Sequence, residues 1–314
     1  MADVDKSDFS ELFVYSPIMM TIAGVITIVL MTIGIVGNLL TVAALLKHAK
    51  IRTVAAAFIA CLCVSDLCLC FLVLPFSASQ FFHGTWIHGD TLCTIIPLVR
   101  YGSVAISLSS VAMISVNRYV LIAFPHLYQT IYSKFNVAVY ILGIWVFSYG
   151  IQIPILMEKW GKFGFDDKLG TCSITLDDNG STAKTTLLIV GFALPCLIII
   201  ISYASIFYVV RKSHKRLQAH TTGKRFGGNE MQITKMVSII FICFLICYLP
   251  LTIVKVFDSD VKYPLLHIIS YLLIYLSSCI NPVVYVTMNR QYRKAYLDTL
   301  LFKKASNLTS QNTP

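Results

Sequence analysis

The sequence predicts an all-α membrane protein, a bundle of seven transmembrane helices followed by a short amphipathic eighth helix. Of the 314 residues, 57% are hydrophobic and only 13% are charged, whereas soluble domains carry about 25% charged residues. Apolar runs of ~20 or more residues, the length that a helix needs to cross a bilayer, recur along the chain. Lipid offers no hydrogen-bond partners to a backbone, so these runs should be helices that pack together.

Seven such runs are present, and few of them contain charge. The first, fourth and fifth contain none, the second contains only Asp66, and the third contains Arg100 and Arg118. Lys255 lies at the outer end of the sixth, and the seventh contains His267. The predicted spans are residues 17–46, 53–79, 91–123, 135–157, 185–210, 236–256 and 263–288.

Charge in the connections predicts how the chain crosses the membrane. The connections on one side hold 16 Lys/Arg and 2 acids, and those on the other side hold 7 Lys/Arg and 12 acids. The basic side should be cytoplasmic, which places the N-terminus outside a multi-pass plasma-membrane protein. The net charge of +10 therefore indicates contact with anionic lipid rather than with nucleic acid.

The predicted domain organisation is simple. The first run is too long for a cleaved signal peptide and is preceded by acidic residues, so it should remain in the mature protein. After the last run, Tyr292, Tyr296 and Leu300 alternate with basic residues, which is typical of an amphipathic helix on the inner surface. We expect an extracellular N-terminus (1–16), a seven-helix domain (17–288), helix 8 (289–302) and a cytoplasmic tail (303–314).

Short motifs follow one another along the spans. They are Gly37-Asn38, "LCVSD" ending at Asp66, Trp86 to Cys93, "NRYVLIAFP" from Asn117 to Pro125, Trp145, Pro195 with Tyr203, Phe244 to Pro250, and "NPVVY" from Asn281 to Tyr285. This ordered set resembles the class A, rhodopsin-like G-protein-coupled receptors over nearly the whole chain. The resemblance implies a receptor that binds an extracellular ligand and activates a heterotrimeric G protein. The alternative is a seven-helix channel, transporter or enzyme, although the sequence shows no internal repeat and no catalytic constellation.

The resemblance assigns roles at the cytoplasmic end. Arg118 would hold the resting state through Glu230 and later contact the G protein, and a snorkelling anchor is the alternative. Asn117 stands where the family usually has an acid, so one restraint on Arg118 is missing. The other residues assigned to activation and coupling are Tyr119, Pro125, Tyr203, Phe244, Pro250, Pro282 and Tyr285.

Pro195 and Pro250 each remove a backbone hydrogen bond and permit a kink. In the family the kink of the sixth helix is a hinge, and a static bend is the alternative. Phe244 occupies the position of the family's packing switch. Tyr248 departs from the tryptophan that is common in the family, and its hydroxyl needs a partner.

Asp66 is a lone carboxylate near the middle of the second span. The resemblance implies a sodium pocket in which Ser107, Ser277, Ser278 and Asn281 supply neutral oxygens, held together by Asn38, and in which sodium favours the resting state. Several oxygen ligands suit a hard cation. A protonated acid that is merely tolerated is the alternative. No other cofactor is expected.

Cys93 and Cys172 are the cysteines in or beside outward-facing connections, where disulfides persist. We expect them to pair, since the sequence spacing from Trp86 to Cys93 also matches that of the receptor family. Asn179-Gly180-Ser181, in the same outer loop as Cys172, is the expected glycosylation site.

Arg100 lies inside an apolar span, where its permanent charge is costly. It is eighteen residues from Arg118, so both lie on one helix face. The role that the resemblance gives to Arg118 requires it to face the bundle interior, so Arg100 should point inward too. We predict that Arg100 binds an anionic group of the ligand; an internal ion pair or snorkelling to the outer headgroups is the alternative. Lys255 is a second positive group, and the predicted pocket wall comprises Tyr101, Val104, Tyr248, Tyr271 and Tyr275.

Two residues of this chain differ from those that define well-known classes of receptor within the family. Light-sensing opsins carry a lysine at the level of Tyr275, and amine receptors carry an aspartate at the position of Arg100. The "NRY" sequence at 117–119, Tyr248 and the segment 126–134 are similar to the moody and trapped-in-endoderm subgroup of invertebrate orphan receptors, with melatonin and medium-chain fatty-acid receptors as more distant relatives. That similarity implies Gi/o coupling and a role in cell migration or barrier formation. The short N-terminus favours a small molecule, lipid or short peptide as ligand.

Overall fold

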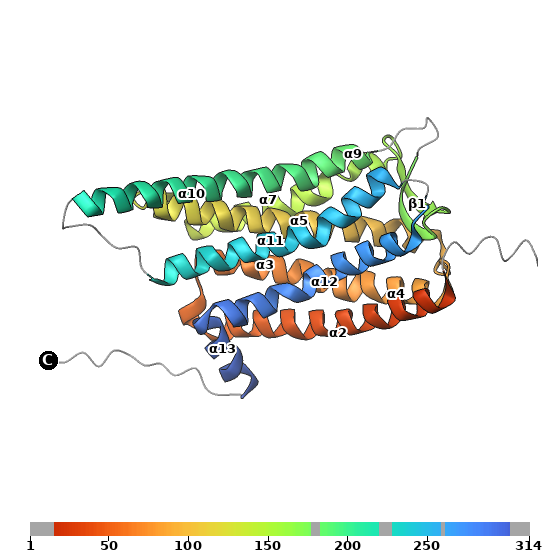
Figure 1. Ribbon diagram of the computed structural model, residues 1–314, viewed down its shortest axis with the longest axis horizontal. Helices are drawn as coiled ribbons and strands as arrows, with labels where there is room; N and C mark the ends of the chain where they lie inside the picture. The colour runs from red at the N-terminus through yellow and green to blue at the C-terminus, as the bar shows by residue number, and fades with distance from the viewer. Residues whose placement is uncertain (1–15, 177–182, 220–227, 259–260, 302–314) are drawn as a thin grey trace, which may run out of the picture.

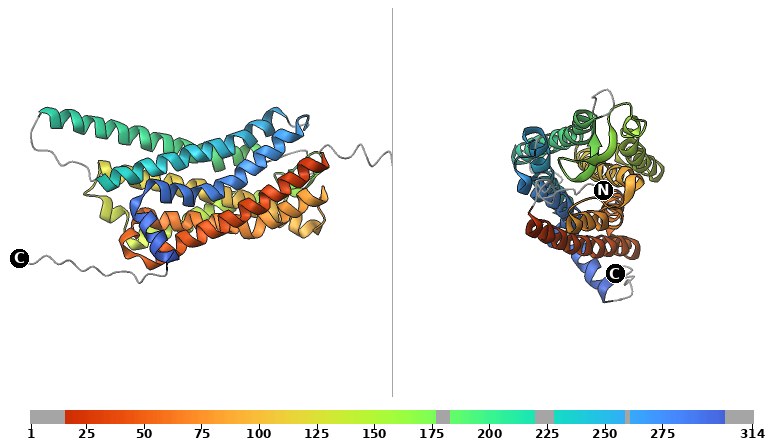
Figure 2. Two further views of the ribbon diagram at one scale, coloured as in Figure 1. Left: turned by 60° about the horizontal axis from the view of Figure 1, so that its bottom comes forward. Right: turned by 90° about the vertical axis from the view of Figure 1, so that its right-hand side faces the viewer.

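The computed structural model describes residues 16–176, 183–219, 228–258 and 261–301. Within these residues seven helices are long and apolar enough to cross a membrane, and they lie side by side in an elongated bundle (Figures 1 and 2). The predicted seven-helix, all-α architecture is therefore confirmed. The spans are Pro17–Lys47, Val54–His83, Gly89–Ala123, Lys134–Leu156, Ile189–Lys212, Gln232–Lys255 and Pro264–Met288.

The elements follow one another with short connections. They are α2 (Pro17–Lys47), η1 (Ala49–Ile51), α3 (Val54–Cys68), η2 (Leu69–Val73), α4 (Leu74–His83), α5 (Gly89–Ala123), α6 (Tyr128–Ile131), α7 (Lys134–Gly150), α8 (Ile153–Leu156), β1 (Lys162–Asp166), β2 (Thr171–Thr175), α9 (Lys184–Leu187), η3 (Leu188–Ala193), α10 (Leu194–Ala219), α11 (Gly228–Phe257), α12 (Pro264–Met288) and α13 (Arg290–Leu300). Helices α10 and α11 extend beyond the predicted apolar runs, because a helix need not end where the bilayer does.

The second and fifth spans each contain a widened, π-helical turn that the sequence does not predict, η2 and η3. A proline follows two residues after each turn, Pro75 and Pro195. Proline lacks the N–H group that a regular helical turn would use, so the hydrogen bonding of the adjacent turn is altered. At Pro195, where the sequence predicts a kink, the structure shows such a turn.

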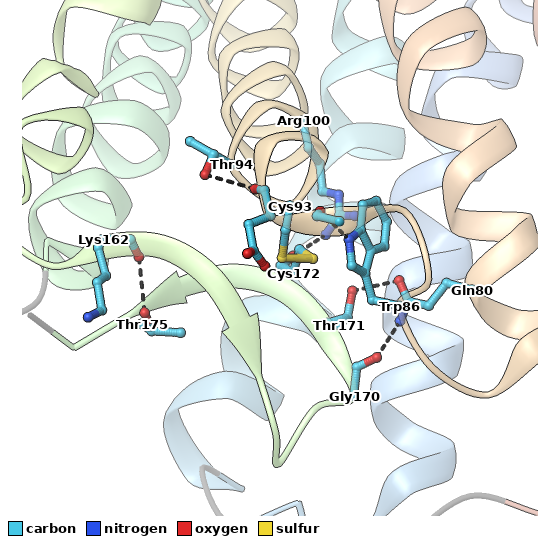
Figure 3. The surroundings of a disulfide bond; sticks show 12 residues. Gln80, Trp86, Cys93, Thr94, Arg100, Lys162, Gly170, Thr171, Cys172 and Thr175 are labelled. Atoms are coloured by element: carbon cyan, nitrogen blue, oxygen red, sulfur yellow. Dashed lines mark hydrogen bonds between the residues drawn. A yellow bond between two sulfur atoms is a disulfide. The ribbon is translucent and has the colours of Figure 1, made fainter.

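The second outer connection forms an antiparallel hairpin of β1 and β2, which the sequence does not predict. The predicted disulfide between Cys93 and Cys172 is present, and it joins β2 to the outer end of α5 (Figure 3). Gln80 of α4 donates to the Gly170 carbonyl at 2.8 Å and accepts from the Thr171 hydroxyl at 2.8 Å. Two separate attachments thus hold the hairpin over the outer end of the bundle.

The expected glycosylation site at Asn179 lies outside the described residues, as do most of the N-terminal segment and the cytoplasmic tail. The eighth helix is confirmed as α13, which turns across the inner end of the bundle (Figure 1). The Asn289 side chain caps it by accepting from backbone N–H groups of its first turn. Tyr292 and Tyr296 are buried as the amphipathic pattern predicts, whereas Leu300 is exposed.

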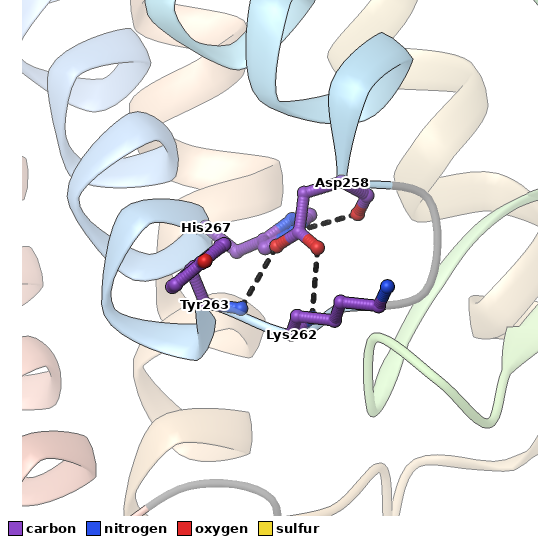
Figure 4. A network of polar contacts seen from close by, with 4 residues as sticks. All are labelled: Asp258, Lys262, Tyr263 and His267. Atoms are coloured by element: carbon purple, nitrogen blue, oxygen red, sulfur yellow. Dashed lines mark hydrogen bonds and ion pairs between the residues drawn. The ribbon is translucent and has the colours of Figure 1, made fainter.

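Asp258 organises the turn between α11 and α12 (Figure 4). Its carboxylate oxygens accept from the backbone N–H groups of Lys262 at 2.8 Å and Tyr263 at 2.9 Å, and His267 Nε2 lies 3.2 Å away. Burial opposes the charge, but the two backbone N–H groups, followed by His267, hold the pKa of the Asp258 carboxyl below its usual value.

The disulfide should be required as a pair. Cys93→Ala and Cys172→Ala should each reduce surface expression by a similar amount, because either change removes the same bond, and the double variant should be no worse than either single one. Surface labelling of intact cells measures this, with Cys68→Ala, a free cysteine, as the control. Additive losses would contradict a shared bond.

We expect the Asp258 contacts to contribute stability that is lost only in strong acid. A carboxyl group with a lowered folded pKa stabilises the fold above its unfolded pKa of about 3.9, and this contribution disappears as the pH falls through the folded pKa. In detergent, the difference in unfolding temperature between wild type and Asp258→Asn should be constant from about pH 7 to pH 5 and shrink below about pH 4. A difference that does not shrink below about pH 4 would contradict this role of the Asp258 carboxylate.

Candidate functional site

A cavity of about 400 Å³ lies in the outer half of the bundle, beneath β2. This volume is within the range of about 300–1,000 Å³ that holds small ligands. Tyr275, which the sequence places in the pocket wall, instead lines a smaller neighbouring cavity and donates to the Ser77 hydroxyl at 3.0 Å. The other six predicted ligand-binding residues all line the larger cavity: Arg100, Tyr101, Val104, Tyr248, Lys255 and Tyr271.

Arg100 is buried inside the bundle and lines the cavity, with 4% of its surface exposed. A guanidinium nitrogen lies 3.5 Å from the Cys172 carbonyl oxygen, and Figure 3 shows the side chain reaching toward the disulfide. The guanidinium carbon is 5.6 Å from the centre of the Tyr271 ring. No carboxylate among the described residues forms an ion pair with Arg100, so an internal ion pair finds no support there.

Lys255 brings a second cation to the same cavity. Its Nζ lies 3.0 Å from the Tyr101 hydroxyl, which also contacts the Ser173 hydroxyl at 3.2 Å. The same Nζ is 5.4 Å from the centre of the Tyr101 ring and 5.6 Å from the centre of the Tyr271 ring. Both cations are therefore beside Tyr271, whose electron-rich face attracts positive charge.

The floor of the cavity is formed by Tyr248, whose hydroxyl has the partner that it needs. The ring stacks on Phe244, with centroids 5.4 Å apart and planes 13° apart. The hydroxyl lies 2.8 Å from Ser277 Oγ on α12. Ser277 already donates to the Ile274 carbonyl at 2.6 Å, so Tyr248 is the donor in the shared bond.

Asp66 is buried below this floor and links three helices. Its two carboxylate oxygens accept from Ser107 of α5 at 3.3 Å and from the Asn281 amide of α12 at 2.8 Å. The structure thus brings together three of the five predicted sodium ligands. Ser277 and Ser278 donate to carbonyls of their own helix.

Oxygen atoms dominate the group around Asp66, and this composition fits a small hard cation. Asn281 turns its amide N–H rather than its carbonyl toward Asp66, so binding a cation there requires a rotation of that amide. Asn38 donates to the Gly34 carbonyl at 2.9 Å and to the Ser278 carbonyl at 2.8 Å, which joins α2 to α12 beside this group.

At the inner end, Arg118 is buried with 2% of its surface exposed. Neighbouring Asn117 donates to the Tyr128 hydroxyl of α6 at 3.1 Å. The neutral amide thus attaches α5 to the second inner connection, residues 124–133 between α5 and α7. Tyr119 meets Phe124 edge to face. Glu230 lies on α11, but its side chain is outside the described part of the chain.

The remaining predicted activation residues lie at this inner end or in the helices that lead to it. Tyr203 donates to the Thr234 carbonyl at 3.1 Å, which ties α10 to α11. Tyr285 is fully buried, with its ring centroid 5.6 Å from that of Tyr292 on α13. Pro282 and Pro250 lie inside α12 and α11, and exposed Pro125 is in the turn after α5.

Gln152, near the outer end of the fourth span, is a lining residue that the sequence analysis missed. It is fully buried, and its Nε2 donates to the Ser148 carbonyl at 3.0 Å. A polar residue within an apolar span was the available signal, because such residues usually face the bundle interior.

The chain is similar to known receptors. It is 45% identical to the G-protein coupled receptor moody of Drosophila melanogaster over 94% of this chain and 53% of that protein. It is 38% identical to Protein trapped in endoderm-1 of the same species over 87% of this chain and 76% of that protein. The crystal structure of squid rhodopsin shares the fold, with a TM-score of 0.81 and 22% identity over 92% of this chain and 87% of that one.

The predicted likeness to the moody and trapped-in-endoderm subgroup is thereby confirmed, although the chain spans only about half the length of the moody receptors. These relatives are receptors rather than enzymes, and they support a multi-pass plasma-membrane protein with its N-terminus outside. Residues 37–285 match the pattern described as "7 transmembrane receptor (rhodopsin family)", and the chain belongs to this family.

Proposed function

We propose that the chain is a G-protein-coupled receptor for a small anionic ligand that binds in the outer cavity. The observation that carries the proposal is Arg100, a buried permanent cation in the cavity wall with no ion-pair partner among the described residues. A charge withdrawn from water needs an opposite charge or several hydrogen bonds to offset the cost. A carboxylate or phosphate supplies both through a forked contact with the guanidinium.

The rest of the cavity supports the same class of ligand. Lys255 adds positive charge beside Arg100, so a cationic ligand is repelled from this region. The remaining wall is largely aliphatic and aromatic, including Val104, Phe192 and Ile274. An acid with an aromatic or lipid-like body matches this combination of charge and apolar surface.

Signalling would begin at Tyr248, which lines the cavity and contacts both α11 and α12. A ligand that displaces its ring disturbs the stack on Phe244 and the bond to Ser277 together. Arg118 at the inner end then contacts the heterotrimeric G protein once α11 moves. The Gi/o coupling and the role in cell migration or barrier signalling that the sequence resemblance implies are also part of this proposal.

We also propose that sodium acts as an allosteric ligand at Asp66. When bound, the ion would supply positive charge between α3, α5 and α12 and favour the resting state. Asp66, Ser107 and Asn281 would hold it, since the structure already places these three side chains in contact.

Arg100→Ala should lower the potency of an anionic agonist about tenfold or more, ~1.5–3 kcal/mol, because a charge-assisted contact is lost. Arg100→Lys should recover only part of this, because an ammonium cannot form the forked contact. A screen of anionic lipids and small acids, each with its neutral amide, against sensors for every G-protein subtype provides the agonist and measures its potency. An agonist without negative charge whose potency survives Arg100→Ala would contradict the proposal.

Arg118→Ala should abolish coupling to the G protein while leaving ligand binding intact.

Asp66→Asn should make agonist potency insensitive to sodium, because it removes the only charge among the candidate ligands. Concentration–response curves in sodium chloride and in the chloride of a large organic cation measure this for both proteins. Equal potency in the two salts for the wild type would rule out a functional sodium site.

A further inference from the structure

The polar side chains that line the outer cavity fall into two groups, and the first group is engaged by the protein itself. The Tyr101 hydroxyl contacts Lys255 Nζ at 3.0 Å, and the Tyr248 hydroxyl contacts Ser277 at 2.8 Å. The Thr252 hydroxyl donates to the Tyr248 carbonyl at 3.1 Å. These groups have little hydrogen-bonding capacity left for recognition of a ligand.

Three other lining residues keep a buried polar atom that has no hydrogen-bond partner within the described residues: Arg100 Nε, the Tyr271 hydroxyl and Gln152 Oε1. Buried polar atoms in folded proteins are nearly always paired, so each exception calls for an explanation. Arg100 and Tyr271 lie against each other, and both are able to donate to one anionic group. They form one subsite, and Gln152 requires a separate explanation.

Gln152 belongs to a different wall of the cavity, at the start of α8 and after the end of α7. Its Nε2 donates to the Ser148 carbonyl at 3.0 Å. This bond fixes the orientation of the amide, since only its nitrogen end is able to donate to a carbonyl. Gln152 Oε1 is therefore a buried acceptor in the cavity wall, and it needs a donor.

A carboxylate or a fully ionised phosphate group is unable to satisfy Gln152 and Arg100 at the same time. Carboxylate and ionised phosphate oxygens accept hydrogen bonds, as Gln152 Oε1 does, so the anionic group pairs with Arg100 and is disfavoured beside Gln152. On the basis of the proposed function, we infer that the ligand carries a second polar group, a hydroxyl or N–H donor, that binds Gln152. The ligand class is then a hydroxylated lipid-like acid or an aromatic acid with a ring N–H.

Matched pairs of acids that differ only in the donor test this inference. One pair is indole-3-acetic acid and 1-methylindole-3-acetic acid, and the other is 10-hydroxydecanoic acid and decanoic acid. The neutral indole-3-acetamide reports whether the negative charge is needed. Affinities are measured by ligand-induced shifts in the unfolding temperature of the purified chain, for wild type, Arg100→Ala, Gln152→Met and Thr252→Val.

In at least one pair, the acid with the donor should bind wild type about fivefold to tenfold more tightly than its partner, as one buried hydrogen bond predicts. Gln152→Met, which keeps the length of the side chain but removes the acceptor, should bring the two members of that pair within about twofold of each other. Thr252→Val, in the same cavity wall, should retain the preference because its hydroxyl is engaged by the backbone. Arg100→Ala should weaken both members equally.

Acids that depend on Arg100 but show no preference within either pair would overturn the donor subsite and leave the proposed function standing. A preference that persists in Gln152→Met would also overturn it. If no acid in the panel binds in an Arg100-dependent way, the proposed function fails, and the donor subsite fails with it. The preference within each pair is measured on the wild-type protein, so this measurement still tests the donor subsite if a variant does not fold.

Discussion

The packing of this bundle depends on one constraint, which is that polar side chains inside a membrane have to find their partners among one another. Asn38 joins α2 to α12 through the Ser278 carbonyl, and Asp66 joins α3 to α5 and α12 through Ser107 and Asn281. Apolar side chains pack equally well against lipid and against protein, so these few hydrogen bonds select which helix faces meet. The same requirement applies to the outer cavity, where Arg100 Nε, the Tyr271 hydroxyl and Gln152 Oε1 have no hydrogen-bond partner among the described residues.

A series of side-chain contacts connects the outer cavity to the inner end of the bundle. Tyr248 is part of the cavity wall, of the aromatic stack with Phe244 and of the hydrogen bond to Ser277. Because Ser277 accepts from Tyr248, rotation of the ring costs α12 a buried hydrogen bond as well as altering α11. Further down, Tyr285 contacts α13 through Tyr292, so α12 carries contacts from the cavity to the inner surface.

The sequence allowed the spans and the eighth helix to be predicted, because a membrane imposes length, composition and amphipathic pattern on any chain that crosses it. The disulfide was predicted from the outward-facing position of its two cysteines and from the family resemblance. Gln152 was missed although a polar residue in an apolar span was a signal, whereas the hairpin and the π-helical turns could not be predicted. Each depends on contacts between segments that are distant in the sequence or on which backbone N–H groups are satisfied. The partner of Tyr248 likewise depends on the rotation of α12 relative to α11, and a motif in one helix contains no information about that rotation.

The contact between Asn117 and Tyr128 has a consequence for the cytoplasmic face. An acid at position 117 would carry a charge that depends on pH, and protonation in acid would remove its attraction to Arg118. The Asn117 amide has no charge to titrate or screen, and its hydrogen bond to Tyr128 is between two neutral groups. The hydrogen bond between Asn117 and Tyr128 therefore keeps its strength when the acidity or the ionic strength of the cytoplasm changes.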